Sequence, residues 1–172
     1  DVDSSGGDSG DSGDSGGSGS TPGVFVISAI TGSTTEAGGT ATFTVNLKSQ
    51  PSANVSIAIS SSDTTEGTVS PSSIMFSSSN WSTAQTVTVT GVNDTAVDGN
   101  QGYTIILGVA SSSDSNYSGL DPADVSVSNT DDDAAGITIN SNGDNTTESG
   151  GSFTFTAKLN SQPSSDVTIA IS

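Results

Sequence analysis

Three adjacent carboxylates, Asp131–Asp133, form the densest group of chemically active side chains in the sequence. Calcium prefers roughly six to eight oxygen ligands, mostly carboxylates and carbonyls supplied by loops. Three neighbouring carboxylates repel one another unless a cation lies among them. The chain contains only two Lys or Arg residues, so its own side chains cannot neutralise such a group. These residues therefore predict a bound cation, and calcium is the cation that suits them best.

Most catalytic chemistry lacks its usual residues in this chain. With no Cys and no His, thiolate nucleophiles are excluded, and most zinc sites and hydrolytic triads lose their ligands or base. Ser is abundant, but a Ser nucleophile needs a base. Paired carboxylates of the glycosidase type are the stronger enzymatic alternative, yet nothing in the sequence sets two of them in a cleft. We therefore expect a protein that is not an enzyme.

The formal net charge of −17 limits the partners that we expect. Nucleic-acid affinity depends on Lys and Arg that neutralise phosphates, and anionic membrane surfaces also repel a negative protein. No run approaches the roughly 18 apolar residues of a membrane helix. We expect neither nucleic-acid binding nor membrane insertion. Scattered acids such as Asp114 and Asp121 are interpreted as solvated surface.

Alternating apolar and small polar residues predict β-strands from Val24 onward. Turn residues separate runs that are rich in Val, Ile, Thr and Phe. Seven short strands within 24–135 are typical of an immunoglobulin-like antiparallel β-sandwich, although the immunoglobulin Cys pair is absent. The expected strands span residues 24–30, 40–47, 54–60, 73–76, 85–92, 103–110 and 124–130.

Residues 1–23 differ in composition from everything that follows. They consist mainly of Gly, Ser and Asp in a short D-S-G repeat, with a single Val. Such a segment cannot bury a core and is extended by its own charge. We expect a disordered or extended linker that precedes the first folded repeat at 24–135.

A long internal repeat indicates tandem domains. Residues 34–60 and 146–172 align without gaps at a constant offset of 112, with 18 identities in 27 positions. The second copy, 136–172, would contain only the first strands of an incomplete repeat, with an open edge and half a core. Two explanations are open: the chain is an excerpt of a longer array, or another chain completes the second copy by strand donation.

Several motifs resemble the Calx-beta family, which comprises calcium-binding sandwich domains of sodium–calcium exchangers and of many bacterial surface repeats. T-T-E-A-G-G-T at 34–40 is similar to the family's early Glu before its second strand. The stretch 80–94, N-W-S-T-A-Q-T-V-T-V-T-G-V-N-D, resembles the bacterial form of the middle strand and the acidic loop after it. The stretch 129–137, N-T-D-D-D-A-A-G-I, resembles the acidic end of one domain running into the next.

The resemblance implies calcium sites at the end of the domain nearest its successor. The loop 93–102 has only two acids, fewer than in the exchanger domains, so we expect one or two ions. Glu66 is an alternative to Asp63 in the loop between the third and fourth strands. The implied ligands are Glu36, Asp63, Asp94, Asp98, Asp131, Asp132 and Asp133.

These observations favour a structural or adhesive repeat module of a large bacterial protein that is extracellular or on the cell surface. Calcium would stiffen the inter-domain end, and the partners would be neighbouring repeats or identical chains in a fibre. One alternative is a filament subunit completed by strand donation. Another is a carbohydrate-binding module for surface glycans, in which Trp81 would stack on a sugar rather than cap the end of the sandwich.

Overall fold

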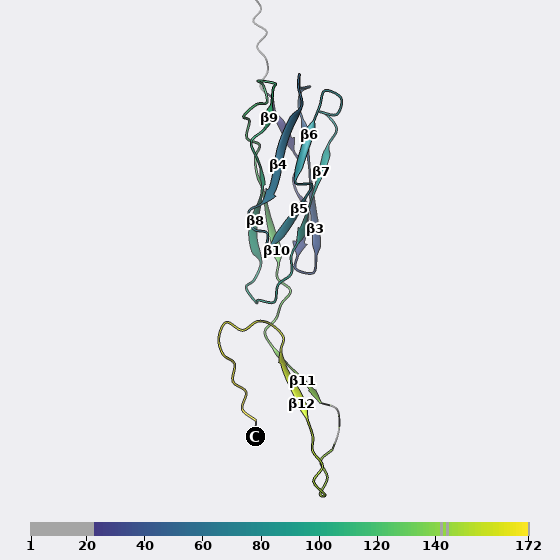
Figure 1. Ribbon diagram of the computed structural model, residues 1–172, viewed down its shortest axis with the longest axis vertical. Coiled ribbons are helices and arrows are strands. Elements are labelled where there is room, and N and C mark those ends of the chain that lie inside the picture. Colours follow the sequence, from purple (N-terminus) through teal and green to yellow (C-terminus); the bar gives the residue numbers. More distant parts are fainter. Residues whose placement is uncertain (1–22, 142, 144, 172) are drawn as a thin grey trace, which may run out of the picture.

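The computed structural model describes residues 23–141, 143 and 145–171 (Figure 1). These residues form twelve β-strands and no helix, which confirms the all-β prediction. No described segment is a helix with the length and apolar character needed to cross a membrane. The expected linker at 1–23 lies, apart from Gly23, outside the described residues. The strands are β1 (Phe25–Ile27), β2 (Thr31–Thr35), β3 (Gly39–Leu47), β4 (Val55–Ser61), β5 (Gly67–Ser70), β6 (Ser73–Phe76), β7 (Gln85–Gly91), β8 (Gln101–Leu107), β9 (Ser111–Ser112), β10 (Val125–Thr130), β11 (Ile137–Ser141) and β12 (Phe155–Leu159).

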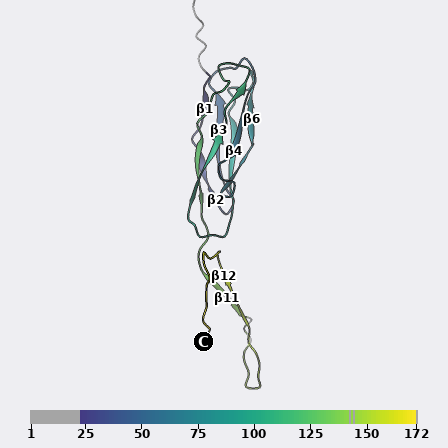
Figure 2. The ribbon, with the colours of Figure 1, turned by 60° about the vertical axis from the view of Figure 1, so that its left-hand side comes forward.

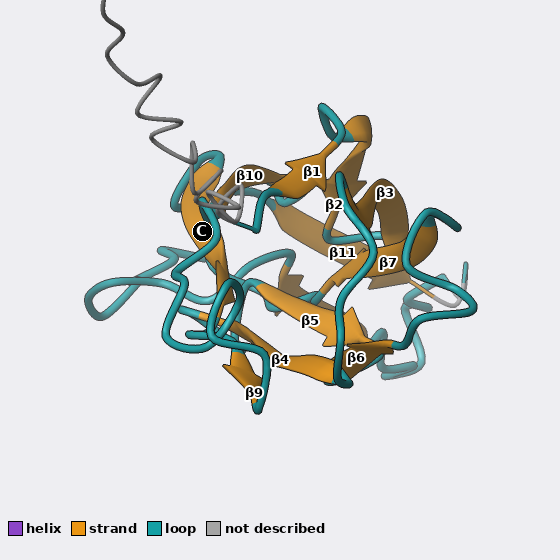
Figure 3. Ribbon diagram, turned by 90° about the horizontal axis from the view of Figure 1, so that it is seen from above, coloured by secondary structure: helices purple, strands orange, loops and turns teal. Residues whose placement is uncertain are grey.

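The first ten strands form one curled sheet. Its order is β5-β7-β3-β2-β10-β8-β4-β6, while β1 pairs with β3 and β9 pairs with β4. β2 and β10 run parallel, and the other described pairings are antiparallel. Curling places β1 and β3 on one side and β4 and β6 on the other (Figure 2). The view along the long axis shows strands on opposite sides of the interior (Figure 3).

Buried apolar residues alternate with more exposed residues along the strands, and the buried ones form the core. In β3, Phe43, Val45 and Leu47 point inward and are buried, while the residues between them are only partly buried. Val87 and Val89 of the neighbouring β7 are fully buried beside them. Each such side chain contributes about 1.5–3 kcal/mol through burial. Other members of this core are Val55, Ile57, Ile59, Ile74, Phe76, Tyr103, Ile105, Leu107 and Tyr117.

The structure has ten strands within 24–135 where the sequence predicted seven. Each of the seven predicted runs overlaps an observed strand, and β2, β5 and β9 are additional. β2 contains no large apolar residue, β5 contains one, and β9 has two residues, so none shows the alternation that reveals a strand. Their neighbours in the sheet determine these strands rather than their own patterns.

The second region, residues 136–171, forms a two-stranded sheet of β11 and β12. In its register Ile137 lies opposite Leu159. β1 and β3 pair with Phe25 opposite Leu47, so the two registers coincide after a shift of 112 residues. The offset of 112 would place a copy of the strand predicted at 54–60 over 166–172, and the described residues 166–171 form no strand. Apolar side chains of this region are exposed: Ile137, Ile139, Phe153, Phe155, Val167, Ile169 and Ile171.

The two regions touch at the junction. The Gln162 N–H of the second region donates a hydrogen bond of 2.7 Å to the Thr95 carbonyl, in the loop that connects β7 to β8. Val97 of the same loop lines a groove together with Ile137 and Leu159. The β7–β8 loop therefore contacts the region that follows it as well as its own sheet.

Candidate metal centre

The chain continues into β11 from one end of the curled sheet (Figure 1), and acidic residues gather at that end. Four segments meet there: the β2–β3 turn, the β4–β5 loop, the β7–β8 loop and the residues directly after β10. They supply two groups of three carboxylates, and within each group the ligand oxygens lie within 4.8 Å of one another. The groups are Glu36, Asp132 and Asp133, and Glu66, Asp94 and Asp98.

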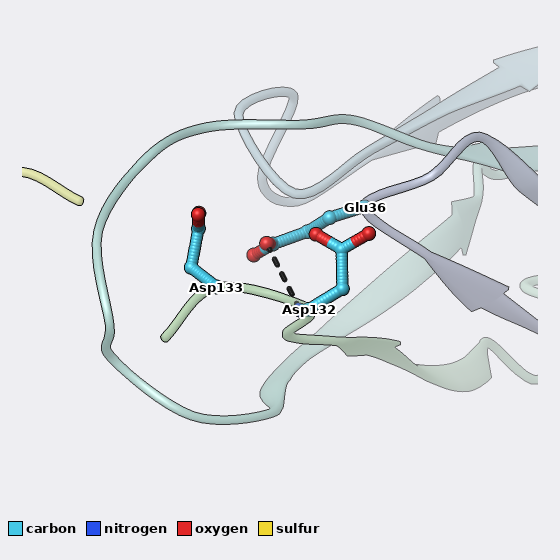
Figure 4. Close-up of side chains that lie close together, drawn as sticks. All are labelled: Glu36, Asp132 and Asp133. Atoms are coloured by element: carbon cyan, nitrogen blue, oxygen red, sulfur yellow. Dashed lines mark hydrogen bonds between the residues drawn. The ribbon is translucent and has the colours of Figure 1, made fainter. Parts of the chain in front are cut away.

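The first group joins the β2–β3 turn to the end of β10. Glu36 is only 4% exposed, and its N–H donates to the Thr130 carbonyl at 3.0 Å. The Asp132 N–H donates to Glu36 Oε2 at 3.4 Å. In Figure 4 the carboxylates of Glu36 and Asp132 lie close together, and the Asp133 carboxylate stands across a gap from them. A cation in that gap would contact oxygens from both segments.

The turn that holds Glu36 is specified by its neighbours in the T-T-E-A-G-G motif. The Gly38 N–H donates to the Thr35 carbonyl at 2.9 Å, and the Gly39 N–H donates to Thr35 Oγ1 at 3.1 Å. Gly38 has φ of 82°, a conformation that favours glycine. This tight turn directs Glu36 toward the residues after β10 instead of into solvent.

Asp131 connects the first group to the β7–β8 loop. Its Oδ2 accepts the Gly99 N–H at 2.7 Å, and its Oδ1 accepts the Asp133 N–H at 2.8 Å. The Asp131 N–H donates to Asn100 Oδ1 at 3.2 Å. Asp131 thus orders the loop around the site through its hydrogen bonds.

The second group lies over Asn129, a buried residue of β10. Asn129 Nδ2 donates to the Val92 carbonyl at 3.0 Å and to Glu66 Oε2 at 3.5 Å. A side chain at Gly91 would collide with the Thr35 carbonyl and with Asn129 Oδ1. The glycine thus allows Asn129 to reach beneath the second group.

Two buried oxygens near the groups lack hydrogen-bond partners among the described residues. They are Asn129 Oδ1 and Asp133 Oδ2. An unsatisfied buried polar atom costs about 1–3 kcal/mol. Both are hard oxygen donors of the kind that calcium prefers, and Asp133 belongs to the first carboxylate group. The first group therefore fits a hard divalent cation, which would pair with Asp133 Oδ2.

Burial and mutual repulsion make the carboxylates of this end easier to protonate. Burial raises the pKa of Glu36 above its ordinary value of 4.5, and Asp131, Asp94 and Asp133 raise it further. Burial also raises the pKa of Glu66, with added repulsion from Asp98, Asp63 and Asp94. The pKa of Asp133 is raised by desolvation and by its acidic neighbours. The charged site is thus strained in the absence of a compensating cation.

The structure brings together most of the residues that the sequence singled out. Glu36, Asp132 and Asp133 form one group, Asp94 and Asp98 belong to the other, and Asp131 bonds to the loop between them. Asp63 is in neither group: its Oδ1 accepts both the N–H and the hydroxyl of Thr65, which lowers its pKa. Glu66, the alternative from the same loop, occupies the place expected for Asp63.

Two residues have roles that the sequence did not reveal. Asn129 precedes the acidic triplet in the N-T-D-D-D motif, but only the fold shows that its amide is buried beneath Glu66. Asp114 was expected to be solvated, and this interpretation is wrong. Asp114 is buried and accepts the N–H groups of Ser52 and Asn116, which lower its pKa.

No protein-family model matches the chain, and no curated protein matches it. These comparisons therefore identify no Calx-beta repeat, and the family relation stays a proposal that rests on the motifs and on the geometry of the site.

Proposed function

We propose that the chain is a non-catalytic structural module of a large bacterial extracellular or surface protein, built from Calx-beta-like tandem repeats that calcium stiffens at their junction. One observation carries this proposal: two groups of three carboxylates lie at the end where the first region continues into the second. Calcium would bind there through the carboxylates of Glu36, Asp132 and Asp133 and of Glu66, Asp94 and Asp98.

The strand arrangement supports an immunoglobulin-like sandwich for 24–135. The beginning of the sandwich is divided into two strands: β1 pairs with β3, and β2 pairs with β3 and, in parallel, with β10. The register of β11 and β12 supports the tandem repeat. Hydrogen bonds recur at the same offset of 112: Lys48 N–H to Val24 O, and Asn160 N–H to Gly136 O, each at 2.9 Å.

The mechanism is mechanical. A cation at the first group would tie the β2–β3 turn to the residues after β10, and Asp131 already binds that segment to the β7–β8 loop through Gly99. The same loop holds the second region through Thr95 and Gln162. Calcium would thereby restrict the junction at 134–136 and keep successive repeats extended.

A calcium titration tests the binding step. We expect heat on titration of the chelator-treated chain, with a dissociation constant of about 10⁻⁴ to 10⁻³ M, as in other extracellular modules. Thermal unfolding in parallel should show stabilisation by about 2.7 kcal/mol at a calcium concentration 100 times the dissociation constant. Neither heat nor stabilisation would refute the proposed cofactor.

Small-angle X-ray scattering tests the mechanical step. We expect a larger maximum dimension and a narrower distribution of interatomic distances with calcium than with chelator. Magnesium at equal ionic strength is the control, since it demands near-octahedral geometry and retains its water. Calcium binding without any change in the scattering would leave the site in place and disprove stiffening.

A further inference from the structure

We propose that the free edge of β12 and the apolar face beside it accept one added strand of the β7 type, an uncharged strand with alternating Thr and Val. This inference rests on the repeat relation proposed above, and it is independent of the cation site. Its starting point is that β12 pairs only with β11 among the described strands, whereas β3, its counterpart, pairs on both edges.

The hydrogen bonds of β11 and β12 show which groups are free. Asn160 donates to the Gly136 carbonyl directly opposite it, so this pair is hydrogen-bonded. Bonded and non-bonded pairs alternate along an antiparallel ladder. The backbone N–H and C=O groups of Phe155, Ala157 and Leu159 therefore face away from β11.

In the first region the corresponding edge is occupied. The Leu47 N–H donates to the Trp81 carbonyl at 2.8 Å, and further along the strand Phe43 pairs with Val87. A shift of 112 residues converts Leu47 and Phe43 to Leu159 and Phe155. The first region thus shows the position and direction that an added strand would take along β12.

The apolar face beside this edge is also exposed. Phe153 and Phe155 are 41% and 42% exposed, with ring centroids 6.4 Å apart. Their counterparts Ala41 and Phe43 are buried in the first region, where β7 pairs alongside β3. An unpaired edge with adjoining exposed aromatic rings is a template for strand addition.

The chemistry of the edge selects the occupant. In β7 the inward residues Val87 and Val89 are β-branched and apolar, and the sequence 85–91 carries no charge. The charged residue in β12 is Lys158, whose side chain alternates to the opposite face from Phe155. A neutral strand with apolar residues on one side and Thr on the other satisfies both the backbone groups and the two rings.

The test uses the whole chain and a fluorescein-labelled peptide with the sequence of residues 83–92, titrated in chelator so that calcium plays no part. We expect saturable fluorescence anisotropy and slower amide hydrogen exchange at residues 153–159. Ala157→Pro removes a free-edge donor and should weaken binding by about tenfold or more, as loss of a backbone hydrogen bond implies. Lys158→Ala, on the same strand, is the matched control and should bind like the unchanged chain.

Two further variants keep the proposal open to refutation if Ala157→Pro unfolds the hairpin. Phe155→Ser keeps the backbone donors and should weaken binding by removing the apolar contact, and a Val87→Pro peptide should not bind. A flat titration to the solubility limit, or protection outside 153–159, would overturn the proposal. A chain dimer that excess peptide does not dissociate would also overturn it, because a second copy would then occupy the edge.

Discussion

Residues 34–60 and 146–172 share 18 of 27 residues but have different surroundings. Phe43 is 1% exposed, whereas its counterpart Phe155 is 42% exposed. Glu36 is buried among acids, whereas its counterpart Glu148 is exposed. Both copies nevertheless form the same first pairing in the same register. The register of the first pairing therefore recurs in both regions, whereas the copy of β4 at 166–171 forms no strand, and burial of the first copy depends on strands that lie much later in the chain.

The largest expected effect separates the two Phe residues. Phe43→Ala should destabilise the first region by about 3–5 kcal/mol, because a buried ring leaves a cavity between β3 and β7. Phe155→Ala should change that stability by less than about 0.5 kcal/mol, since it removes an exposed ring. Urea unfolding followed by the fluorescence of Trp81 measures both. Equal losses of stability in the two variants would mean that the two regions share one core and that the difference in burial has no energetic consequence.

This contrast explains how far the sequence could predict the fold. Period-two patterns located each of the seven runs that overlap an observed strand in 24–135, because inward apolar residues are visible in the sequence. β2 and β5 were missed because their pairing partners, not their own side chains, place them in the sheet. Such long-range effects have no local signature.

The candidate site was predictable to a similar extent. The triplet Asp131–Asp133 is visible as a cluster in the sequence, and the family resemblance added Glu36, which the fold brings beside it. The choice between Asp63 and Glu66 depends on which loop position turns back toward β10, and Thr65 captures Asp63 locally. The burial of Asn129 and Asp114 is visible only in the folded structure, because nothing in the sequence around them differs from that of solvent-exposed polar residues.

The matched pair Glu36→Gln and Glu148→Gln sharpens the comparison at the site. Calcium at 100 times its dissociation constant should stabilise the unchanged chain and Glu148→Gln by about 2.7 kcal/mol, and Glu36→Gln by much less. In chelator, Glu36→Gln should instead be more stable than the unchanged chain and Glu148→Gln, because removing a buried charge beside Asp131–Asp133 relieves repulsion. Thermal unfolding of the three chains with and without calcium gives all six values. Loss of the stabilisation by calcium in Glu148→Gln would place the calcium site in the second region.

The pH dependence of the stability of the folded state should also change sign when calcium is bound. Without calcium, the raised pKa values of Glu36, Glu66 and Asp133 mean that the folded state binds more protons than the unfolded state. Stability should therefore fall as the pH rises through the window above the ordinary values of 4.5 and 3.8. With calcium, deprotonated ligands bind the ion, so the stabilisation by calcium should grow over the same window.

Asp63 and Asp114 determine how stability changes at the lowest pH values. The lowered pKa values of Asp63 and Asp114 contribute stability that is present above 3.8 and is lost as the pH falls further. Melting temperatures in chelator should thus pass through a maximum in mildly acidic buffer. A monotonic rise toward neutral pH in chelator would show that the acids of the junction are not strained.

The smallest expected effect concerns the loops before β4 and its counterpart. The Tyr117 hydroxyl donates to the Ser49 carbonyl at 2.6 Å, whereas the corresponding Ser161 belongs to the loop held by Thr95 and Gln162. Tyr117→Phe should cost about 1 kcal/mol because it removes this hydrogen bond. The edge-on contact with Phe25, with ring centroids 6.1 Å apart, should remain.

Ser161→Ala is the control from the second region and should have no measurable effect on the first. If Tyr117→Phe were neutral while Tyr117→Ala unfolded the region, the ring rather than the hydroxyl would hold this end.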